Sequence, residues 1–360
     1  MFFKYLFFLL ISLNVFSVEQ SLIINIPAGS SDESFYITGD FCDWKPDCLK
    51  LGSLNDFSIK IPLLNEWKGS KIKITKGSWE LEACDRNGQA LPDIKLNEYK
   101  SLQVINIHSW CNSNLDQGES FHFYYFFQSL KKYRRVNIYI PKDYSYDPID
   151  SSFVLFLDGQ NTFDATRSAF GYEWRADEAV EKLQLNSKIL VSIDNGGKYR
   201  TEEYHYFKKG KDFSREISNE FLKSLCEEFF LKSKCVGNII VGSSLGAIFA
   251  FTTSFSYPEV FSKSISLSFP AFAYDDFVFR FLDEQSGIPS NQNIFYFDFG
   301  GLGQDRNYGE HFKRFLNKTE VQKLNFIWNK FPYHGHNELN WGQRLPFIFK
   351  QMIFKDLFSM

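Results

Sequence analysis

Short apolar runs alternate with polar turns over the first third of the chain. Runs with the residue types of β-strands lie at 22–26, 34–38, 57–62, 71–76 and 102–107. Such a series, separated by Gly, Pro or polar residues, predicts a small antiparallel sandwich. We expect this part to occupy residues 18–110, followed by a polar linker at 111–120.

The pattern changes from about residue 121, where strand-like runs begin to alternate with helical ones. Strands are expected at 134–139, 153–157, 189–193, 236–241, 262–267, 294–299 and 323–328, and helices at 174–183, 214–230 and 308–316. This alternation predicts a mostly parallel α/β sheet. Residues 121–360 are therefore expected to form one α/β region whose element order suits an α/β-hydrolase.

The most informative segment is G-S-S-L-G at 242–246, because an apolar run precedes it and an apolar helical pattern follows it. In a G-x-S-x-G turn between a strand and a helix, the central serine is exposed on a strained backbone and the glycines let the two elements pass closely. Ser244 is thus the candidate nucleophile. The alternative is that Ser243 and Ser244 only cap the following helix, which serine does well without any chemistry.

A serine esterase also needs a base and an acid that orients the base, and in α/β-hydrolases both follow the nucleophile in the chain. The histidines after Ser244 are His311, His334 and His336. His311 falls inside an expected helix, as surface histidines often do. His334 and His336 lie in a loop after the last expected strand, where a base would be presented.

Several ordered motifs now make the chain resemble the putative esterase family of α/β-hydrolases, which includes feruloyl, acetyl-xylan and siderophore esterases and S-formylglutathione hydrolases. The resemblance covers roughly residues 134–354. The motifs are VNIYIP at 136–141, LDGQNTFD at 157–164, EWRADE at 173–178, IDNG at 193–196 with Arg200, Glu203 and Tyr204, the serine turn, and HNE at 336–338 followed by Trp341.

This resemblance implies that His336, rather than His334, is the base, and that His334 is a neighbour that shapes the pocket. Family members place the acid after a strand that ends in a Gly-rich turn, which here favours Asp305, although the turn is longer than usual. Asp298, inside the expected strand, and Glu310 remain alternatives for this acid.

Charge that develops on the substrate oxygen must be stabilised by backbone N–H groups. Leu245, directly after the nucleophile, is expected to supply one of them, and the family match places the second at Gln160. Asn161 is expected to help shape the same loop. The alternative is that Asp158 and Gly159 form an ordinary turn.

Six cysteines, an even number, fit an oxidising compartment. Proximity along the chain suggests the pairs Cys42–Cys48, Cys84–Cys111 and Cys226–Cys235, and the alternative is buried free thiols. No Cys/His spacing resembles a zinc site, so no metal is expected.

Residues 1–17 combine Lys4 with a short apolar run and predict a cleaved signal peptide, hence a secreted or periplasmic protein. The apolar run is too short to span a bilayer comfortably, so no stable membrane insertion is expected after cleavage. A net charge of -3 suggests neither nucleic acid nor an anionic membrane as a partner.

Within the expected sandwich, GDFCDWKP at 39–46 resembles the Gly-x-Phe-x-x-Trp-x-Pro turn of starch- and glycogen-binding β-sandwiches, and KITKGSWE at 73–80 resembles a strand of that superfamily. By this resemblance Trp44 and Trp79 would stack on sugar rings. The alternative for each tryptophan is a position in the core.

Together these features predict a secreted serine esterase that acts on a carboxylic ester, on a small molecule or linked to a carbohydrate, and that needs no cofactor. Alternatives are a siderophore esterase, an acyltransferase, or a non-catalytic glycan-binding protein on a hydrolase fold. Segments 204–213 and 269–286 are expected to be loops that select the substrate.

Overall fold

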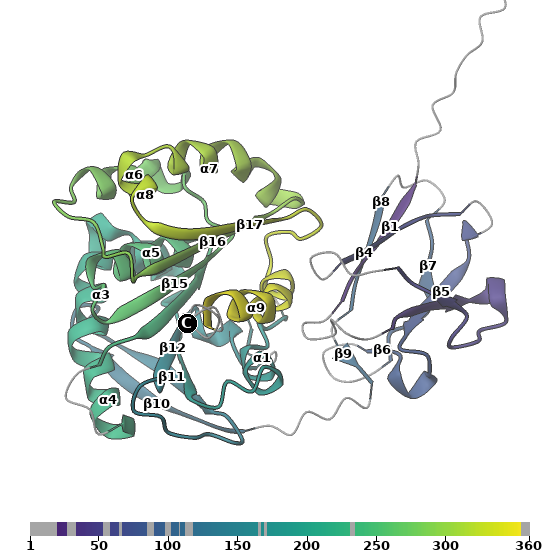
Figure 1. The fold of residues 1–360 in the computed structure, drawn as a ribbon, viewed down its shortest axis with the longest axis horizontal. Helices are drawn as coiled ribbons and strands as arrows, with labels where there is room; N and C mark the ends of the chain where they lie inside the picture. Colours follow the sequence, from purple (N-terminus) through teal and green to yellow (C-terminus); the bar gives the residue numbers. More distant parts are fainter. Residues whose placement is uncertain are drawn as a thin grey trace, which may run out of the picture.

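The structure is a computed structural model, which describes residues 20–26, 34–52, 58–64, 67–84, 90–97, 102–107, 109–111, 118–164, 167–168, 171–230 and 235–353. Two parts lie side by side in Figure 1: an N-terminal β region (residues 20–111) and an α/β region (residues 118–353). The expected signal peptide lies outside the described residues, as does most of the expected linker. Among the helices described, none has the length and apolar character required to cross a membrane.

Short strands build the N-terminal β region. One sheet has the order β4-β1-β8, a second the order β3-β2-β5-β7, and β6 pairs with β9. The bounds are β1 Ser21–Asn25, β2 Tyr36–Gly39, β3 Leu49–Lys50, β4 Ser58–Pro62, β5 Lys71–Thr75, β6 Ala83–Cys84, β7 Ile94–Lys95, β8 Leu102–Asn106 and β9 Ser109–Trp110. The pattern predicted an antiparallel sandwich, but β1 and β8 pair in parallel. The reason is that β8 returns to the sheet after a long excursion through β2 to β7, so no hairpin imposes an antiparallel pairing.

Apolar side chains from both larger sheets share one core, which includes Ile24, Ile37, Ile72 and Ile105. Disulfides join Cys42 to Cys48 and Cys84 to Cys111 in this region, and Cys226 to Cys235 in the α/β region. The three pairs suggested by proximity along the chain are confirmed.

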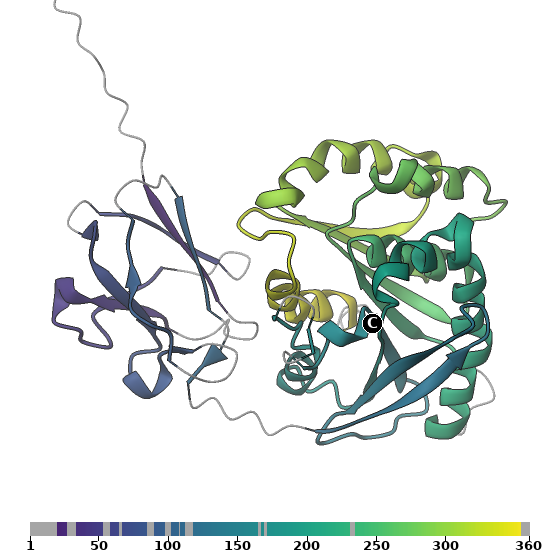
Figure 2. The ribbon, with the colours of Figure 1, turned by 180° about the vertical axis from the view of Figure 1, so that it is seen from behind.

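An eight-stranded sheet of order β10-β11-β13-β12-β14-β15-β16-β17 forms the centre of the α/β region (Figure 2). All neighbours from β13 to β17 are parallel, while β10 and β11 are antiparallel to their neighbours, so the predicted mostly parallel sheet is confirmed. The bounds are β10 Glu119–Phe127, β11 Lys132–Ile140, β12 Ser152–Leu157, β13 Lys188–Ile193, β14 Asn238–Ser243, β15 Phe261–Leu267, β16 Ile294–Gly300 and β17 Asn325–Phe331.

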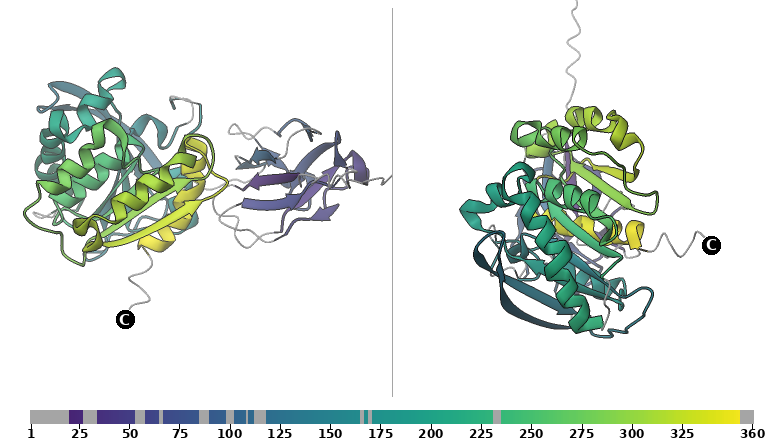
Figure 3. Two further views of the ribbon diagram at one scale, coloured as in Figure 1. Left: turned by 90° about the horizontal axis from the view of Figure 1, so that it is seen from above. Right: turned by 90° about the vertical axis from the view of Figure 1, so that its left-hand side faces the viewer.

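Helices cover both faces of this sheet (Figure 3). They are α1 Ala176–Lys182, α2 Arg200–Tyr204, α3 Lys211–Glu216, α4 Leu222–Phe230, α5 Leu245–Ser256, α6 Ala273–Asp283, α7 Tyr308–Leu316, α8 Thr319–Gln322 and α9 Glu338–Ile353. Side chains of α1 and α9 pack into one core, and those of α3 to α7 into the other, which is dominated by phenylalanine. Because parallel strands are buried on both faces, β12 to β14 are apolar almost throughout.

Several expected strands differ from the structure in their limits by one to three residues, and two of these differences have a clear local cause. The strand expected at 236–241 begins at Asn238, because Gly237 has a φ of 77° and turns the chain. The strand expected at 323–328 is β17, which begins at Asn325, because Leu324 N donates to Val321 O and closes the turn after α8. In addition, β10 begins two residues before the expected start of the α/β region at 121.

Candidate active site

Ser244 lies at the turn between β14 and α5, at the carboxyl end of a central strand. Its φ of 54° and ψ of -125° fall outside the regions that non-glycine residues favour. Such strain costs about 1–3 kcal/mol and persists where the surrounding structure enforces it. The serine therefore occupies the sharp strand–helix turn that the G-x-S-x-G pattern predicted.

Close packing at this turn explains the first glycine of the pattern. A Cβ atom on Gly242 would lie 2.2 Å from the carbonyl oxygen of Gly246 and 3.0 Å from the backbone nitrogen of Ala247. Any side chain at Gly242 would therefore push the first turn of α5 away from β14.

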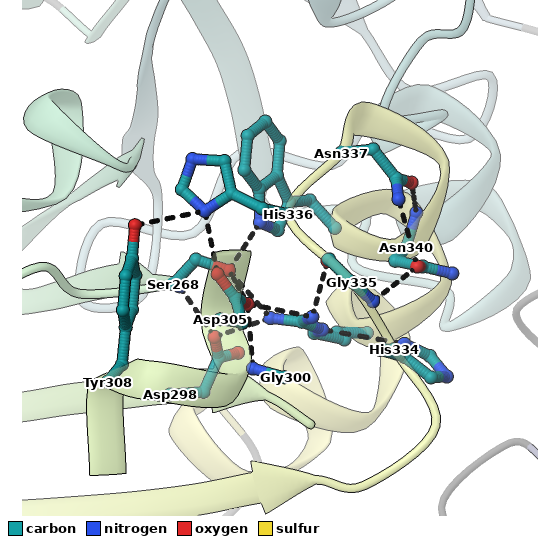
Figure 4. Close-up of polar contacts among 12 residues, drawn as sticks. Ser268, Asp298, Gly300, Asp305, Tyr308, His334, Gly335, His336, Asn337 and Asn340 are labelled. Atoms are coloured by element: carbon teal, nitrogen blue, oxygen red, sulfur yellow. Dashed lines mark hydrogen bonds and ion pairs between the residues drawn. The ribbon is translucent and has the colours of Figure 1, made fainter. Parts of the chain in front are cut away.

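His336 lies in the loop between β17 and α9, and its side chain points toward Asp305 (Figure 4). Its Nδ1 atom is 2.7 Å from Asp305 Oδ1. A neutral imidazole that donates from Nδ1 to a carboxylate leaves Nε2 as a proton acceptor. This geometry gives His336 the tautomer that a general base requires.

Asp305 is completely buried in the short 3₁₀ helix η8 (Gly303–Asn307) after β16. Its Oδ2 atom accepts hydrogen bonds from Ser268 Oγ at 2.5 Å and Gly300 N at 2.7 Å. Burial alone would raise the pKa of Asp305, but the hydrogen bond to His336 and the positive charge of Arg344 lower it below its usual value. Asp305 is therefore held as an anion.

The other candidate acids and bases lie elsewhere. Asp298 pairs with Arg344, with 2.8 Å between Oδ1 and NH1, and burial raises its pKa. Glu310 is exposed on α7 and pairs with Lys313. His311 is exposed on the same helix beside Phe272.

The two residues expected to supply backbone N–H groups frame Ser244. Leu245 is the first residue of α5, so its N–H has no partner within the helix. Gln160 lies in the 3₁₀ helix η4 (Gly159–Asn161) directly after β12. The Gln160 side chain accepts from Asn195 N at 3.2 Å, and the Asn161 side chain donates to Glu338 Oε1 at 3.3 Å. These contacts fix the η4 loop beside the nucleophile turn.

A cavity of about 580 Å³ joins these elements. Its lining consists of Asp158, Gln160, Asn161, Tyr172, Asn195, Gly197, Arg200, Ser243, Ser244, His336, Asn337, Glu338 and Trp341. Ser244, His336 and Gln160 thus face one space, large enough for a small ester. Within the described residues, no three His, Cys, Asp or Glu side chains are grouped as metal ligands.

The segments 204–213 and 269–286 do not form the expected loops. They contain a π-helical turn at Tyr206–Gly210 and helix α6, and the described residues that line the cavity come from other segments. The apolar side chains Phe277 and Phe281 explain α6, because they pack at helical spacing into the large core.

Comparison with known proteins gives this site its family. Residues 128–349 match the family model described as putative esterase, which is more than half of the chain. The chain belongs to the putative esterase family. Membership of this family supports carboxylic ester hydrolysis.

Relatives and solved structures agree with this assignment at the level of fold. The enterobactin esterase of Shigella flexneri is 13% identical with a TM-score of 0.53, and the match covers 94% of this chain and 93% of that chain. The ferric enterobactin esterase of Salmonella typhimurium is 14% identical with a TM-score of 0.54, and the match covers 91% and 90%. Both matches extend into the N-terminal β region.

A curated relative covers a smaller part of the chain. The uncharacterized protein YjcH of Bacillus subtilis is 26% identical over 149 residues, which are 40% of this chain and 59% of the relative. The match therefore spans less than two thirds of the relative's length.

A partly buried ion pair forms one wall of the cavity of this esterase-family chain. Arg200 donates to both carboxylate oxygens of Asp158, at 2.6 and 2.7 Å, and also to Ser243 O at 3.2 Å. Asn195 donates to the same carboxylate at 2.6 Å. A bidentate pair of this kind fixes the guanidinium plane, so Arg200 supports the backbone just before Ser244.

Sequence reasoning missed Ser268 and Arg344. Ser268 Oγ donates to Asp305 and accepts from Trp341 Nε1 at 2.8 Å, while Arg344 bonds Asp298 and the loop before His336. A signal existed for Ser268 but not for Arg344. Ser268 follows β15 at the carboxyl edge of the parallel sheet, where sites form. Arg344 had no such signal, because α9 carries other polar residues as well, among them Glu338, Gln343 and Lys350.

Proposed function

We propose that this chain is a secreted serine esterase in which Ser244 is the nucleophile, His336 the general base and Asp305 the acid that orients it. The observation that supports this most is the 2.7 Å contact between His336 Nδ1 and Asp305, made by a histidine that shares a cavity with the strained Ser244. A nucleophile, a base and an orienting acid are the groups that acyl transfer requires.

The reaction follows from these roles. His336 Nε2 takes the hydroxyl proton of Ser244 as Oγ bonds to the ester carbonyl carbon, and the negative charge moves to the carbonyl oxygen. The N–H groups of Leu245 and Gln160 stabilise that oxygen. The carbon–oxygen bond to the alcohol then breaks, and the alcohol leaves with the proton from His336. Water, deprotonated by His336, finally releases the acid and restores Ser244.

We further propose that the substrate is an ester linked to a carbohydrate. Under this proposal residues 18–110 form a carbohydrate-binding-like domain, joined through a linker at 111–120 to the esterase domain at 121–360. Trp79 supports a sugar-stacking role because 40% of its surface is exposed, whereas Trp44 is half-buried. The disulfides support export by a signal peptide at 1–17, since such bonds persist in oxidising compartments.

The first experiment is hydrolysis of p-nitrophenyl acyl esters, feruloyl esters and acetylated xylan fragments by the full chain. Enterobactin belongs in the same panel, because the solved structures described above, which match about nine tenths of this chain, are enterobactin esterases. Labelling of Ser244 by a fluorophosphonate runs in parallel, with Ser244→Ala and His336→Ala as controls.

The outcomes separate the candidate functions. Turnover and labelling that both controls abolish would support the esterase, and the preferred substrate would name its class. Greater turnover when an alcohol or sugar replaces water as acceptor would indicate an acyltransferase. Absence of both turnover and labelling in the wild type would reject the enzyme in favour of a glycan-binding protein.

A further inference from the structure

The proposed reaction gives no role to the buried His334. His334 lies two residues before His336 on the same loop and is almost fully buried. In Figure 4 it lies beyond Gly335, away from the pair formed by His336 and Asp305. Its place is the junction of the two regions of the molecule.

On the side of the N-terminal β region, His334 contacts a row of polar side chains that crosses three strands. Ser58, Asn25 and Asn106 are aligned in register across β4, β1 and β8. Ser58 Oγ donates to Asn25 Oδ1 at 2.6 Å, and Asn25 Nδ2 donates to Asn106 Oδ1 at 2.8 Å. Ser58 Oγ also lies 3.5 Å from His334 Nε2.

The same row of polar side chains also contacts the backbone of the loop that carries His334 and His336. Asn25 Nδ2 lies 3.3 Å from the carbonyl oxygen of Tyr333. Nearby, Gln343 Nε2 of α9 donates to Ile107 O at 3.5 Å. Asn25 and Ser58 are both buried, so their amide and hydroxyl groups need these partners.

On the side of the α/β region, Arg344 holds the loop. Its Nε atom lies 3.4 Å from His334 Nδ1, and NH2 donates to Gly335 O at 3.0 Å. The same guanidinium pairs with Asp298 at 2.8 Å and lies 3.6 Å from Asp305 Oδ2. One side chain therefore contacts both the loop that presents His336 and the carboxylate that orients it.

The donors and acceptors in this chain of contacts have one consistent direction. A guanidinium only donates, so His334 Nδ1 accepts, and the ring proton must be on Nε2. Nε2 then donates to Ser58 Oγ, and the Ser58 hydroxyl is free to donate to Asn25. Burial and the nearby charge of Arg344 lower the pKa of His334 well below its usual value, which keeps this neutral tautomer.

We propose that the N-terminal β region positions the catalytic histidine, with Ser58, Asn25 and His334 as positioning residues that fix residues 333–335 from the side opposite Arg344. The proposal rests on the proposed function, because it assigns His336 as the base. Reacting groups displaced by about 1 Å lose rate steeply, so fixing the loop should affect the chemical step more than substrate binding.

The test uses the full chain and the rate at which a fluorophosphonate modifies Ser244, together with kcat and KM on the best ester. Ser58→Ala and His334→Phe each remove one partner of the contact between the regions. Each should slow labelling and lower kcat about two- to tenfold with KM unchanged, the range expected for one hydrogen bond. His334→Gln, which can keep a donor toward Ser58, should restore most of the rate.

A double-mutant cycle distinguishes positioning from a general loss of stability. If both single variants break the same contact, the double variant should be no slower than the slower single variant. Thr75→Val is the matched control, because Thr75 makes its hydrogen bonds to Pro46 O and Gly77 N inside the N-terminal β region. It should label at the wild-type rate.

Two results would overturn the proposal. One is a Ser58→Ala variant that labels at the wild-type rate. The other is additive losses in the double variant with an equal loss in Thr75→Val, which would indicate general destabilisation. If wild-type Ser244 is not labelled at all, the proposed function itself fails, so the two failures can be distinguished.

Discussion

The N-terminal β region and the α/β region bury apolar side chains on different scales. The first has strands of two to five residues, one core and two disulfides. The second has strands of up to nine residues, two cores packed with aromatic rings, and one disulfide. A small core contributes little to the free energy of unfolding, and disulfides compensate for that.

The features of the candidate site that reduce stability lie in the region with the larger cores. Ser244 on its strained turn and the two buried carboxylates Asp298 and Asp305 around Arg344 all belong to the α/β region. Strain and buried charge reduce stability, so they persist where the surrounding core is large. The N-terminal β region supplies neutral contacts, Ser58 and Asn25, to the same loop.

The largest expected effect tests whether the strained turn carries the chemistry. Ser244→Ala should lower kcat by about 10⁴- to 10⁶-fold, because no other group can form the acyl-enzyme. Ester hydrolysis and fluorophosphonate labelling check it. Ser243→Ala is the matched control and should keep most of the activity. Equal residual activity in the two variants would exclude Ser244 as the nucleophile.

The next effect distinguishes the two buried carboxylates. Asp305→Asn should lower kcat about 10³- to 10⁴-fold, because an amide no longer holds His336 in the required tautomer. Asp298→Asn should act mainly on stability, by about 3 kcal/mol, because it breaks a fully buried ion pair. Kinetics and denaturant unfolding of both variants give the comparison. A larger loss of kcat in Asp298→Asn would reverse the assignment.

Much of the fold could be predicted from the sequence, because the signals were local. Helix α7 begins and ends at the residues that the periodicity indicated, and β12, β13 and β16 lie within one residue of the expected ranges. The parallel pairing of β1 with β8 could not be predicted, since it depends on contacts between residues about 80 positions apart. Helix α6 lies in a segment that was expected to be a loop, although Phe277 and Phe281 have helical spacing.

Only the parts of the candidate site that lie in recognisable sequence motifs were predicted. The serine turn and the loop of His336 follow from local patterns and a family resemblance. Arg344 and Ser58 act through contacts between distant segments, and a single Ser or Arg has no local pattern that reveals such a contact. The roles of Ser244, His336 and Asp305 stay predictions that the variants above test.

Removal of disulfides would show how much the N-terminal β region depends on cross-links. Loss of Cys84–Cys111 through Cys84→Ser and Cys111→Ser should destabilise that region by about 3.5 kcal/mol, from the chain entropy of a loop with a sequence separation of 27. Loss of Cys226–Cys235, with a separation of 9, should cost about 2.5 kcal/mol.

Calorimetry can follow both disulfide variants. In the variant without Cys84–Cys111, the N-terminal β region should unfold at a lower temperature than the α/β region. In the variant without Cys226–Cys235, the α/β region should unfold first, or both regions should unfold in one transition. Identical shifts of a single transition in both variants would show that the two regions unfold as one unit. The different core sizes of the N-terminal β region and the α/β region would then not affect the order in which the two regions unfold.

The smallest effect concerns a buried carboxyl beside the cavity. Burial raises the pKa of Glu338 from 4.5 to about 7, so the folded state keeps a proton that the unfolded chain releases between these pH values. Stability should fall as the pH rises from about 4.5 to about 7, by about 2–3 kcal/mol for this group, and stay constant above. Glu338→Gln keeps the acceptor for Asn161 and removes the titration.

The variant should therefore gain stability over the wild type between pH 5 and pH 8 in urea unfolding. Glu310→Gln, an exposed carboxylate on α7, should show no such gain. Parallel pH curves for the wild type and Glu338→Gln would mean that Glu338 has the same pKa in the folded and unfolded states, so that its burial does not disfavour the charged form. A difference that grows with pH would instead show that the large core tolerates buried charge only where a partner such as Arg344 compensates it.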